Sequence, residues 1–227
     1  GALHGCGRAG QPPTPPMNLI GDFGGGGMML AFGLLAGIIS ARATGKGQVI
    51  DCAMTEGSAL LMAMIYSFRA DNHWNDDRGA NMLDGAAPYY DAYETAEGKY
   101  ISLGAIEPQF YREMLALTGL ADDPLMGAQN DRESWPRQKA KIAAAIRTKT
   151  RDEWCAILEN SDACFAPVMS LDEAPRHAHN VARASFVEVD GVLQPAPAPR
   201  FSAEPILGGL GLNAAEIDRL YREGVVA

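Results

Sequence analysis

The stretch Gly21-Asp22-Phe23-Gly24-Gly25-Gly26-Gly27 decides how the first part of the chain is interpreted. Glycines let a backbone approach a ligand closely, and a helix that begins near Gly27 would direct free N–H groups toward an anion. A carboxylate in such a loop can take a proton from a carbon beside a carbonyl while the N–H groups stabilise the enolate oxygen. Asp22 is equally a favoured N-cap residue, and the local sequence favours that capping interpretation.

The residues after the glycines predict a helix, a short strand and a second helix. Met28–Ala43 is apolar on almost every side, as core helices are, and Gly45 favours a C-terminal end there. The apolar stretch Met28–Ser40 has about thirteen residues, whereas a membrane span needs roughly twenty, so we expect a buried helix. Gln48–Cys52 predicts the strand and Met54–Arg69 the second helix.

The middle of the chain predicts a compact module of strands and helices. Two strand-like runs, residues 89–95 and 99–103, flank a turn at Glu97-Gly98 and predict a hairpin. Further elements are expected as helices at 109–118, 135–148, 151–160 and 170–177, and as a strand at 164–168. Prolines between residues 194 and 205 predict an extended connector, and Asn213 is the predicted N-cap of a tail helix.

Composition is typical of a soluble globular protein. The 227 residues are 47% hydrophobic and 21% charged, which suits one large domain or two small ones. The net charge of -9 argues against a nucleic-acid binder. The four cysteines have no C-x-x-C spacing, so reduced thiols are expected rather than disulfides or zinc. His177 and His179 have no third ligand nearby, and no metal site is predicted.

Glu107 and the methionines each allow two interpretations. Glu107 lies between a predicted strand and Pro108, where an acid often stabilises the start of a helix, although such a carboxylate can also orient a catalytic histidine. The local sequence favours the structural role. Most of the 10 methionines are expected in core helix faces, although a flexible cluster could line a pocket for varied acyl chains.

Several motifs together resemble the class III acyl-CoA transferase superfamily. Gly21–Gly26 and Gly45–Asp51 are similar to the signature of the superfamily. Arg78–Gly85 with Ala87–Tyr90, and Gly104–Tyr111, are similar to the α-methylacyl-CoA racemases within it. The motifs occur in the same order as in the family from Gly1 to about Phe201, and the resemblance continues more loosely to the end. Several long motifs in the same order argue against chance similarity.

The resemblance implies racemisation of 2-methyl-branched acyl-CoA thioesters through an enolate. One group removes the α-proton, and an acid on the opposite face returns a proton. By resemblance, Asp22 serves one face and Glu107 holds a histidine that serves the other. The implied substrate-binding residues are Gly24, Gly25, Met54, Met82, Leu83 and Tyr90. No cofactor is expected, because CoA is part of the acyl-CoA substrate.

The implied fold is α/β, with part of a Rossmann-like large domain, a smaller α+β domain and extended linkers, in an interlocked homodimer. The expected divisions are residues 1–53 as part of the large CoA-binding domain, 54–85 as a linker helix and loop, 86–172 as the small domain, 173–205 as a returning linker and 206–227 as a C-terminal segment on the large domain. Neither nucleic acid nor a membrane is expected as a partner. The last residues do not form a Ser-Lys-Leu signal, and a cytoplasmic location is expected.

One part of the racemase pattern has no counterpart in this sequence. The catalytic histidine of the racemases lies in a Gly-His-Asp-like segment upstream of the residue that matches Gly1, and His4 falls after that motif. We therefore expect a C-terminal portion of a racemase that is inactive by itself. The alternatives are CoA transfer between carboxylic acids, with Asp22 as a nucleophile, and a non-catalytic binding module. Glu107 has no evident task in transfer, which favours the racemase.

Overall fold

The computed structural model describes residues 1–200 and 211–225. They fall into two compact units, Gly1–Val168 and Met169–Ala227. Both units combine helices with antiparallel strands, which confirms the predicted mixed α/β class. Residues 1–89, all of which are described, contain helices but no strand, so the sheet of the first unit belongs to its later part.

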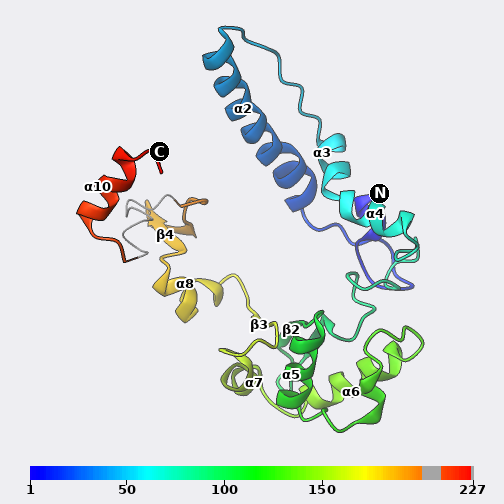
Figure 1. Cartoon of the computed structure of the whole chain (residues 1–227). Helices are drawn as coiled ribbons and strands as arrows, with labels where there is room; N and C mark the ends of the chain where they lie inside the picture. The colour runs from blue at the N-terminus through cyan, green and yellow to red at the C-terminus, as the bar shows by residue number, and fades with distance from the viewer. Residues whose placement is uncertain (201–210, 226–227) are drawn as a thin grey trace. The chain divides into compact units, whose positions relative to one another are not determined.

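The first unit begins with a short helix, α1 (Ala2–Gly5), and a long one. The glycine-rich segment forms a π-helix, η1 (Leu19–Met28), which runs directly into α2 (Met29–Thr44). Gly45 ends α2 in the left-handed conformation, with a φ of 70°, which confirms the predicted end of the helix. Figure 1 shows α2 as a long rod, with the following segment returning beside it.

The helix predicted at Met28–Ala43 is confirmed as α2, but the expectation that it is buried is wrong. Because the glycines are helical as well, the continuous helix Leu19–Thr44 has 26 residues. Its most apolar stretch has a mean hydropathy of 1.7, and only 6% of that stretch is buried. By length and composition it is long enough to cross a membrane, a test that core helices of soluble proteins also pass. Phe32 and Ile39 are 73% and 68% exposed, because nothing in the first unit covers this face.

The segment after α2 packs on that helix but forms no strand. A Cβ atom on Gly33 or Gly37 would lie 3.1 Å or 2.6 Å from side-chain atoms of Ile50, so these glycines make room for the returning chain. The predicted strand Gln48–Cys52 is wrong, because no described strand pairs with it. Two helices follow in place of the predicted single one, α3 (Met54–Leu61) and α4 (Ala63–Ala70), with a break at Met62.

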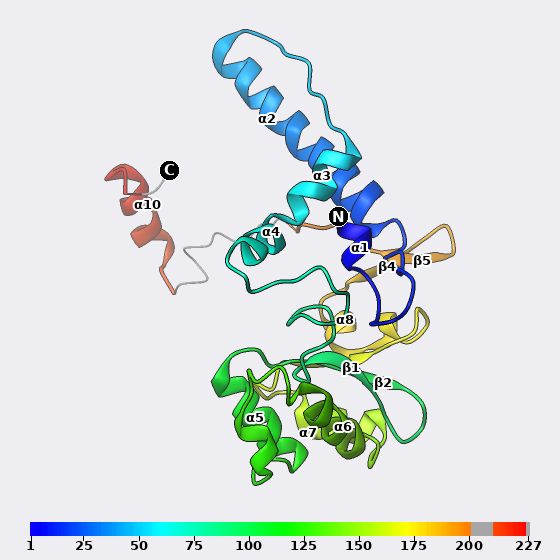
Figure 2. The same cartoon turned by 90° about the vertical axis from the view of Figure 1, so that its right-hand side faces the viewer.

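The later part of the first unit is a three-stranded antiparallel sheet with helices on one side. The strands are β1 (Tyr90–Glu94), β2 (Tyr100–Gly104) and β3 (Phe165–Val168), in the order β1-β2-β3. The predicted hairpin is confirmed, with Tyr90 opposite Gly104. Figure 2 shows α5 (Pro108–Thr118), α6 (Trp135–Ile146) and α7 (Arg151–Leu158) beneath the sheet. A 3-10 helix, η2 (Pro124–Gly127), links α5 to α6.

The core of the first unit lies between this sheet and its helices. Alternate β2 residues, Ile101 and Leu103, are 0% and 3% exposed, whereas Ser102 between them faces the open side of the sheet. Trp154 of α7 is 1% exposed, and its indole N–H donates to the Ile146 carbonyl at 2.8 Å. Edge-to-face contacts join Tyr89 to Tyr111 and Trp135.

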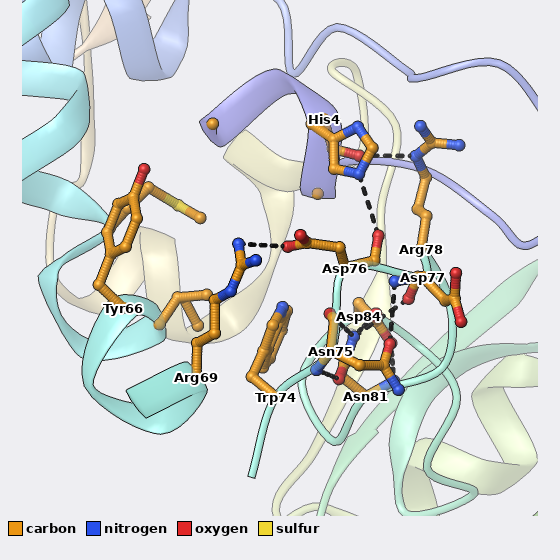
Figure 3. Close-up of a pocket in the computed structure, with 14 residues that line it drawn as sticks. His4, Tyr66, Arg69, Trp74, Asn75, Asp76, Asp77, Arg78, Asn81 and Asp84 are labelled. Atoms are coloured by element: carbon orange, nitrogen blue, oxygen red, sulfur yellow. Dashed lines mark hydrogen bonds and ion pairs between the residues drawn. The ribbon is translucent and has the colours of Figure 1, made fainter. Parts of the chain in front are cut away.

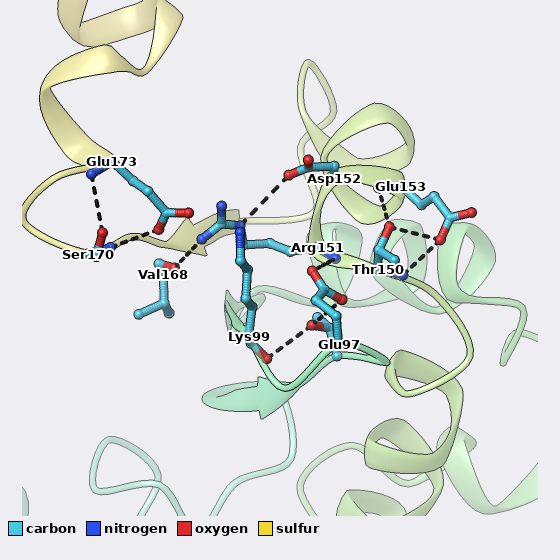
Figure 4. Close-up of polar contacts among 10 residues, drawn as sticks. Glu97, Lys99, Thr150, Arg151, Asp152, Glu153, Val168, Ser170 and Glu173 are labelled. Carbon is cyan, nitrogen blue, oxygen red and sulfur yellow. Dashed lines mark hydrogen bonds and ion pairs between the residues drawn. The ribbon is translucent and has the colours of Figure 1, made fainter.

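Polar contacts join the β1–β2 turn to α7 and β3 (Figure 4). The Glu97 carboxylate accepts from the Arg151 amide at 2.8 Å and from the Thr95 hydroxyl at 2.9 Å. The Arg151 guanidinium donates to the Val168 carbonyl at 3.0 Å. Thr150 and Glu153 form a capping box at the start of α7. The turn, the helix start and the edge strand are therefore fixed to one another.

The second unit contains short elements. They are the 3-10 turn η3 (Ala174–Arg176), the helix α8 (Ala178–Ala182), the hairpin of β4 (Phe186–Val189) and β5 (Val192–Pro195), and the helix α10 (Ala214–Arg222). The helix predicted at 170–177 is reduced to η3. Part of the connector predicted at 194–205 is β5 instead, and residues 201–205 lie outside the described residues. Asn213 caps α10 as predicted.

Candidate active site

Asp22 lies in the first turn of η1, and its side chain is exposed. The N-cap position belongs to Asn18, whose carbonyl accepts the Phe23 N–H at 3.1 Å. The prediction that Asp22 caps a helix beginning near Gly27 is therefore wrong, because the helix begins earlier and includes the glycines. Asp22 is left with a carboxylate that its own helix does not use as a cap.

The predicted thioester contacts Gly24 and Gly25 lie where η1 packs on α3. A Cβ atom on Gly25 would lie 2.7 Å from the Ser58 amide nitrogen, and one on Gly57 would lie 1.9 Å from the Gly25 carbonyl oxygen. A Cβ atom on Gly24 would lie 3.2 Å from Leu61. The glycines are needed for this close helix contact, so their substrate contacts stay a prediction.

A pocket of about 460 Å³ lies beside Asp22. Its walls come from α1, the loop that contains Pro15 and Pro16, the start of η1 and the start of α3, and they are mostly apolar. Met54, a predicted acyl contact, shares this pocket with Asp22. The lining residues are Gly1, Ala2, Leu3, Pro15, Pro16, Met17, Ile20, Gly21, Asp22, Met54, Thr55 and Ser58.

Two other predicted acyl contacts, Leu83 and Tyr90, meet in a second pocket of about 510 Å³. Tyr90, Ser102, Gly104 and Ala166 form its floor on the three strands. A third pocket, of about 600 Å³, shares residues with both others. It has Ala2 and Pro16 in common with the Asp22 pocket, and Arg8 and Leu83 in common with the Leu83–Tyr90 pocket. The predicted acyl contact Met82 packs instead against the core.

Glu107 precedes Pro108, the first residue of α5, and is exposed. It occupies the N-cap position, where an acid stabilises the start of a helix, although its side chain makes no capping hydrogen bond. The pKa of the Cys164 thiol is raised by burial first and then by the negative charge of Glu107. The residues that line the Asp22 pocket do not include Glu107.

The segment Arg78–Gly85 folds around the Asp84 carboxylate, an arrangement that no sequence motif indicated (Figure 3). Asp84 accepts from the amides of Gly79, Ala80 and Asn81 at 2.9, 3.2 and 2.9 Å. Asn81 is 1% exposed, and its side-chain amide donates to Asp84 at 2.8 Å. Arg78 donates to the carbonyl of His4 at 2.8 Å.

Thiols and potential metal ligands are dispersed. The cysteines are free, as expected: Cys6, Cys52, Cys155 and Cys164. Within residues 1–200 and 211–225, no three side chains of the metal-binding types gather into a site.

The chain belongs to CoA-transferase family III, whose family model matches residues 1–206. It is 43% identical to α-methylacyl-CoA racemase of Mus musculus, over 97% of this chain and 60% of that protein. It is 41% identical to α-methylacyl-CoA racemase of Homo sapiens, over 92% of this chain and 57% of that protein. The chain thus spans about 60% of the length of these curated relatives.

Solved structures show the same fold. A CAIB/BAIF family protein from Brucella suis superposes with a TM-score of 0.69 at 19% identity, covering 89% of this chain and 54% of that one. Rv3272 from Mycobacterium tuberculosis superposes with a TM-score of 0.65 at 19% identity, covering 86% and 51%. The resemblance to the superfamily and to its racemases is confirmed.

Proposed function

We propose that this chain takes part in racemisation of 2-methyl-branched acyl-CoA thioesters, with Asp22 as the acid–base group on one face of the α-carbon. The observation that carries the proposal is the exposed Asp22 carboxylate in a mostly apolar pocket that also contains Met54. The identity of 43% to a racemase over 97% of this chain supports the reaction class.

The start of η1 offers donors for the enolate oxygen. The Phe23 N–H donates to the Asn18 carbonyl. The N–H groups of Ile20, Gly21 and Asp22 precede Phe23 in the first turn of η1. These three residues line the Asp22 pocket. Amide donors at a helix start favour developing negative charge, which an enolate needs at its oxygen. We therefore assign the enolate contact to these amides, ahead of the glycines that pack on α3.

The opposite face of the α-carbon needs a second acid–base group. None of the residues that line the Asp22 pocket is a histidine. We propose that a histidine held by Glu107 supplies this face, because the Glu107 carboxylate is exposed and makes no capping hydrogen bond. No histidine of the described chain lies in the pocket to do so, and we expect the chain alone not to racemise.

The test follows the α-proton in deuterated buffer. The chain is incubated with each epimer of a 2-methylacyl-CoA, with and without imidazole as a substitute for a histidine side chain. We expect α-deuterium incorporation that depends on imidazole and that disappears in Asp22→Asn. Mass spectrometry gives the label, and chiral chromatography gives the epimer.

The rival function is CoA transfer between carboxylic acids, in which Asp22 would form a mixed anhydride. It predicts no α-deuterium, product only when an acceptor acid is added, and an Asp22 adduct that hydroxylamine cleaves. Imidazole-dependent label that persists in Asp22→Asn, or no label at any imidazole concentration, would contradict the racemase proposal. Glu107→Gln, compared with wild type, reports whether that carboxylate affects the imidazole dependence.

A further inference from the structure

Asp91 is the centre of an ion cluster that joins three segments of the first unit. Its side chain is 5% exposed and lies on the helix-facing side of β1. Arg8, from the loop after α1, places Nη1 2.6 Å from Asp91 Oδ1. Lys139, from α6, pairs with the other carboxylate oxygen. A buried carboxylate with two cations depends strongly on both, because removing either one leaves charge without compensation.

The same cations hold the corner before β1. Lys139 also donates to the Gly85 carbonyl, and Gly85 has a φ of 90°. A Cβ atom on Gly85 would lie 2.6 Å from Arg8 Nη1 and 3.3 Å from Asp91 Oδ1. Only glycine fits there without moving the Arg8 guanidinium. The corner of residues 83–85 is therefore shaped by the ion cluster.

Both predicted acyl contacts of the second pocket lie next to this cluster. Leu83 is in the corner that Arg8 and Lys139 hold, and Tyr90 precedes Asp91 in β1. Arg8 lines the Leu83–Tyr90 pocket and also the pocket that shares residues with the Asp22 pocket. A change in the cluster must therefore alter the wall of the Leu83–Tyr90 pocket.

We propose that Arg8, Asp91 and Lys139 are positioning residues that set the acyl-chain pocket of Leu83 and Tyr90. This inference rests on the proposed function, since it assigns that pocket to the acyl chain of the thioester. The cluster determines how much the affinity increases with the length of the acyl group, whereas Asp22 transfers the proton. The ligand class is a branched aliphatic acyl group that extends beyond the α-carbon.

The experiment measures the affinity of the full chain for N-acetylcysteamine thioesters of 2-methyl acids with increasing chain length. These probes carry the acyl group without CoA, so the slope of affinity against chain length reports the acyl pocket alone. We expect Arg8→Ala and Asp91→Asn to reduce binding of the longest thioester by at least about tenfold relative to the shortest. Arg8→Lys should restore part of the slope, because a cation returns near Asp91.

The control is an ion pair between the same strand and Arg147, the residue that follows the last turn of α6. Arg147 lies 2.5 Å from Glu94 of β1, but the two side chains are 65% and 38% exposed. An exposed pair contributes little, so Arg147→Ala should leave the chain-length slope unchanged. The comparison separates loss of a β1 salt bridge in general from loss of the buried cluster.

Each result decides the inference. An unchanged slope in Arg8→Ala overturns it, and so does an equal loss for short and long thioesters, because that loss reflects general destabilisation. If Arg8→Ala or Asp91→Asn does not fold, Lys139→Arg and Arg8→Lys are compared at equal melting temperature, and a slope equal to wild type overturns the inference. A wild-type chain with no slope also overturns it, whereas the deuterium assay decides the role of Asp22 separately.

Discussion

At the scale of single residues, the glycine run shows that one motif can serve packing and chemistry at neighbouring positions. Gly25 lies against α3, where a side chain would overlap Ser58. Asp22, three residues earlier, lines the apolar pocket. The sequence shows glycines and a carboxylate together, but only the helical path shows which of them contact protein.

Replacement of Gly57 by alanine tests this packing. The added Cβ would lie 1.9 Å from the Gly25 carbonyl oxygen, so η1 and α3 must separate. We expect the free energy of unfolding to fall by about 1–3 kcal/mol, measured by urea denaturation. The control is Gly27→Ala, whose Cβ would meet its nearest atom, the Asp22 carbonyl oxygen, at 3.5 Å. It should stabilise the helix by about 0.5–1 kcal/mol, and equal effects of the two variants would contradict the assignment.

At the scale of elements, the sequence predicted the structures that depend on contacts between residues close in the chain. The β1–β2 hairpin and the Asn213 cap of α10 were correct, because a turn residue or a cap lies within a few residues of its partner. The strand expected at Gln48–Cys52 failed, because a strand needs a partner that the segment itself does not contain. The β4–β5 hairpin was missed although Asp190-Gly191, both at positive φ, is a strong turn signal.

The contacts of Glu97 predict a pH dependence for the junction of the β1–β2 turn with α7. Desolvation raises the pKa of Glu97, but hydrogen bonds from Arg151, its own amide and Thr95, together with Lys99, hold that pKa below its ordinary value. The carboxylate therefore stabilises the fold above its ordinary pKa, and this contribution is lost as the pH falls through the lowered folded value.

Glu97→Gln should therefore be less stable than wild type at neutral pH and lose less stability on acidification between about pH 5 and 3. The measurement is the urea midpoint against pH. Thr95→Val removes one of the hydrogen bonds and should give an intermediate slope. Parallel curves for wild type and Glu97→Gln would show that Glu97 has no part in the pH dependence.

At the scale of the whole molecule, the sequence could not show which pockets the site residues share. Met54 and Asp22 meet in one pocket and Leu83 and Tyr90 in another, because chain segments distant in sequence fold together. Arg8 forms an ion pair with Asp91 for the same reason, and their separation in the sequence gives no sign of it. Family resemblance named most of these residues, whereas their grouping depends on the tertiary contacts of the first unit.

The exposed apolar face of α2 predicts that the chain associates with itself. Phe32, Leu35 and Ile39 are 73%, 63% and 68% exposed and lie on one helix face. Apolar surface of this kind is usually covered by a partner, and we expect a second copy of the chain to cover it. Sedimentation equilibrium at micromolar concentration should give a dimer for wild type and a monomer for the triple variant Phe32→Ser, Leu35→Ser and Ile39→Ser.

The matched control is Arg42→Ser, an exposed polar position on the same helix, which should remain dimeric. The triple variant should nearly keep the melting temperature of the first unit, because the three side chains are mostly exposed there. A monomeric wild type, or a triple variant that stays dimeric, would contradict the role of this face. Wild-type chain that sediments with phospholipid vesicles, while the triple variant does not, would assign the face to a membrane, since a helix of 26 residues is long enough to span one.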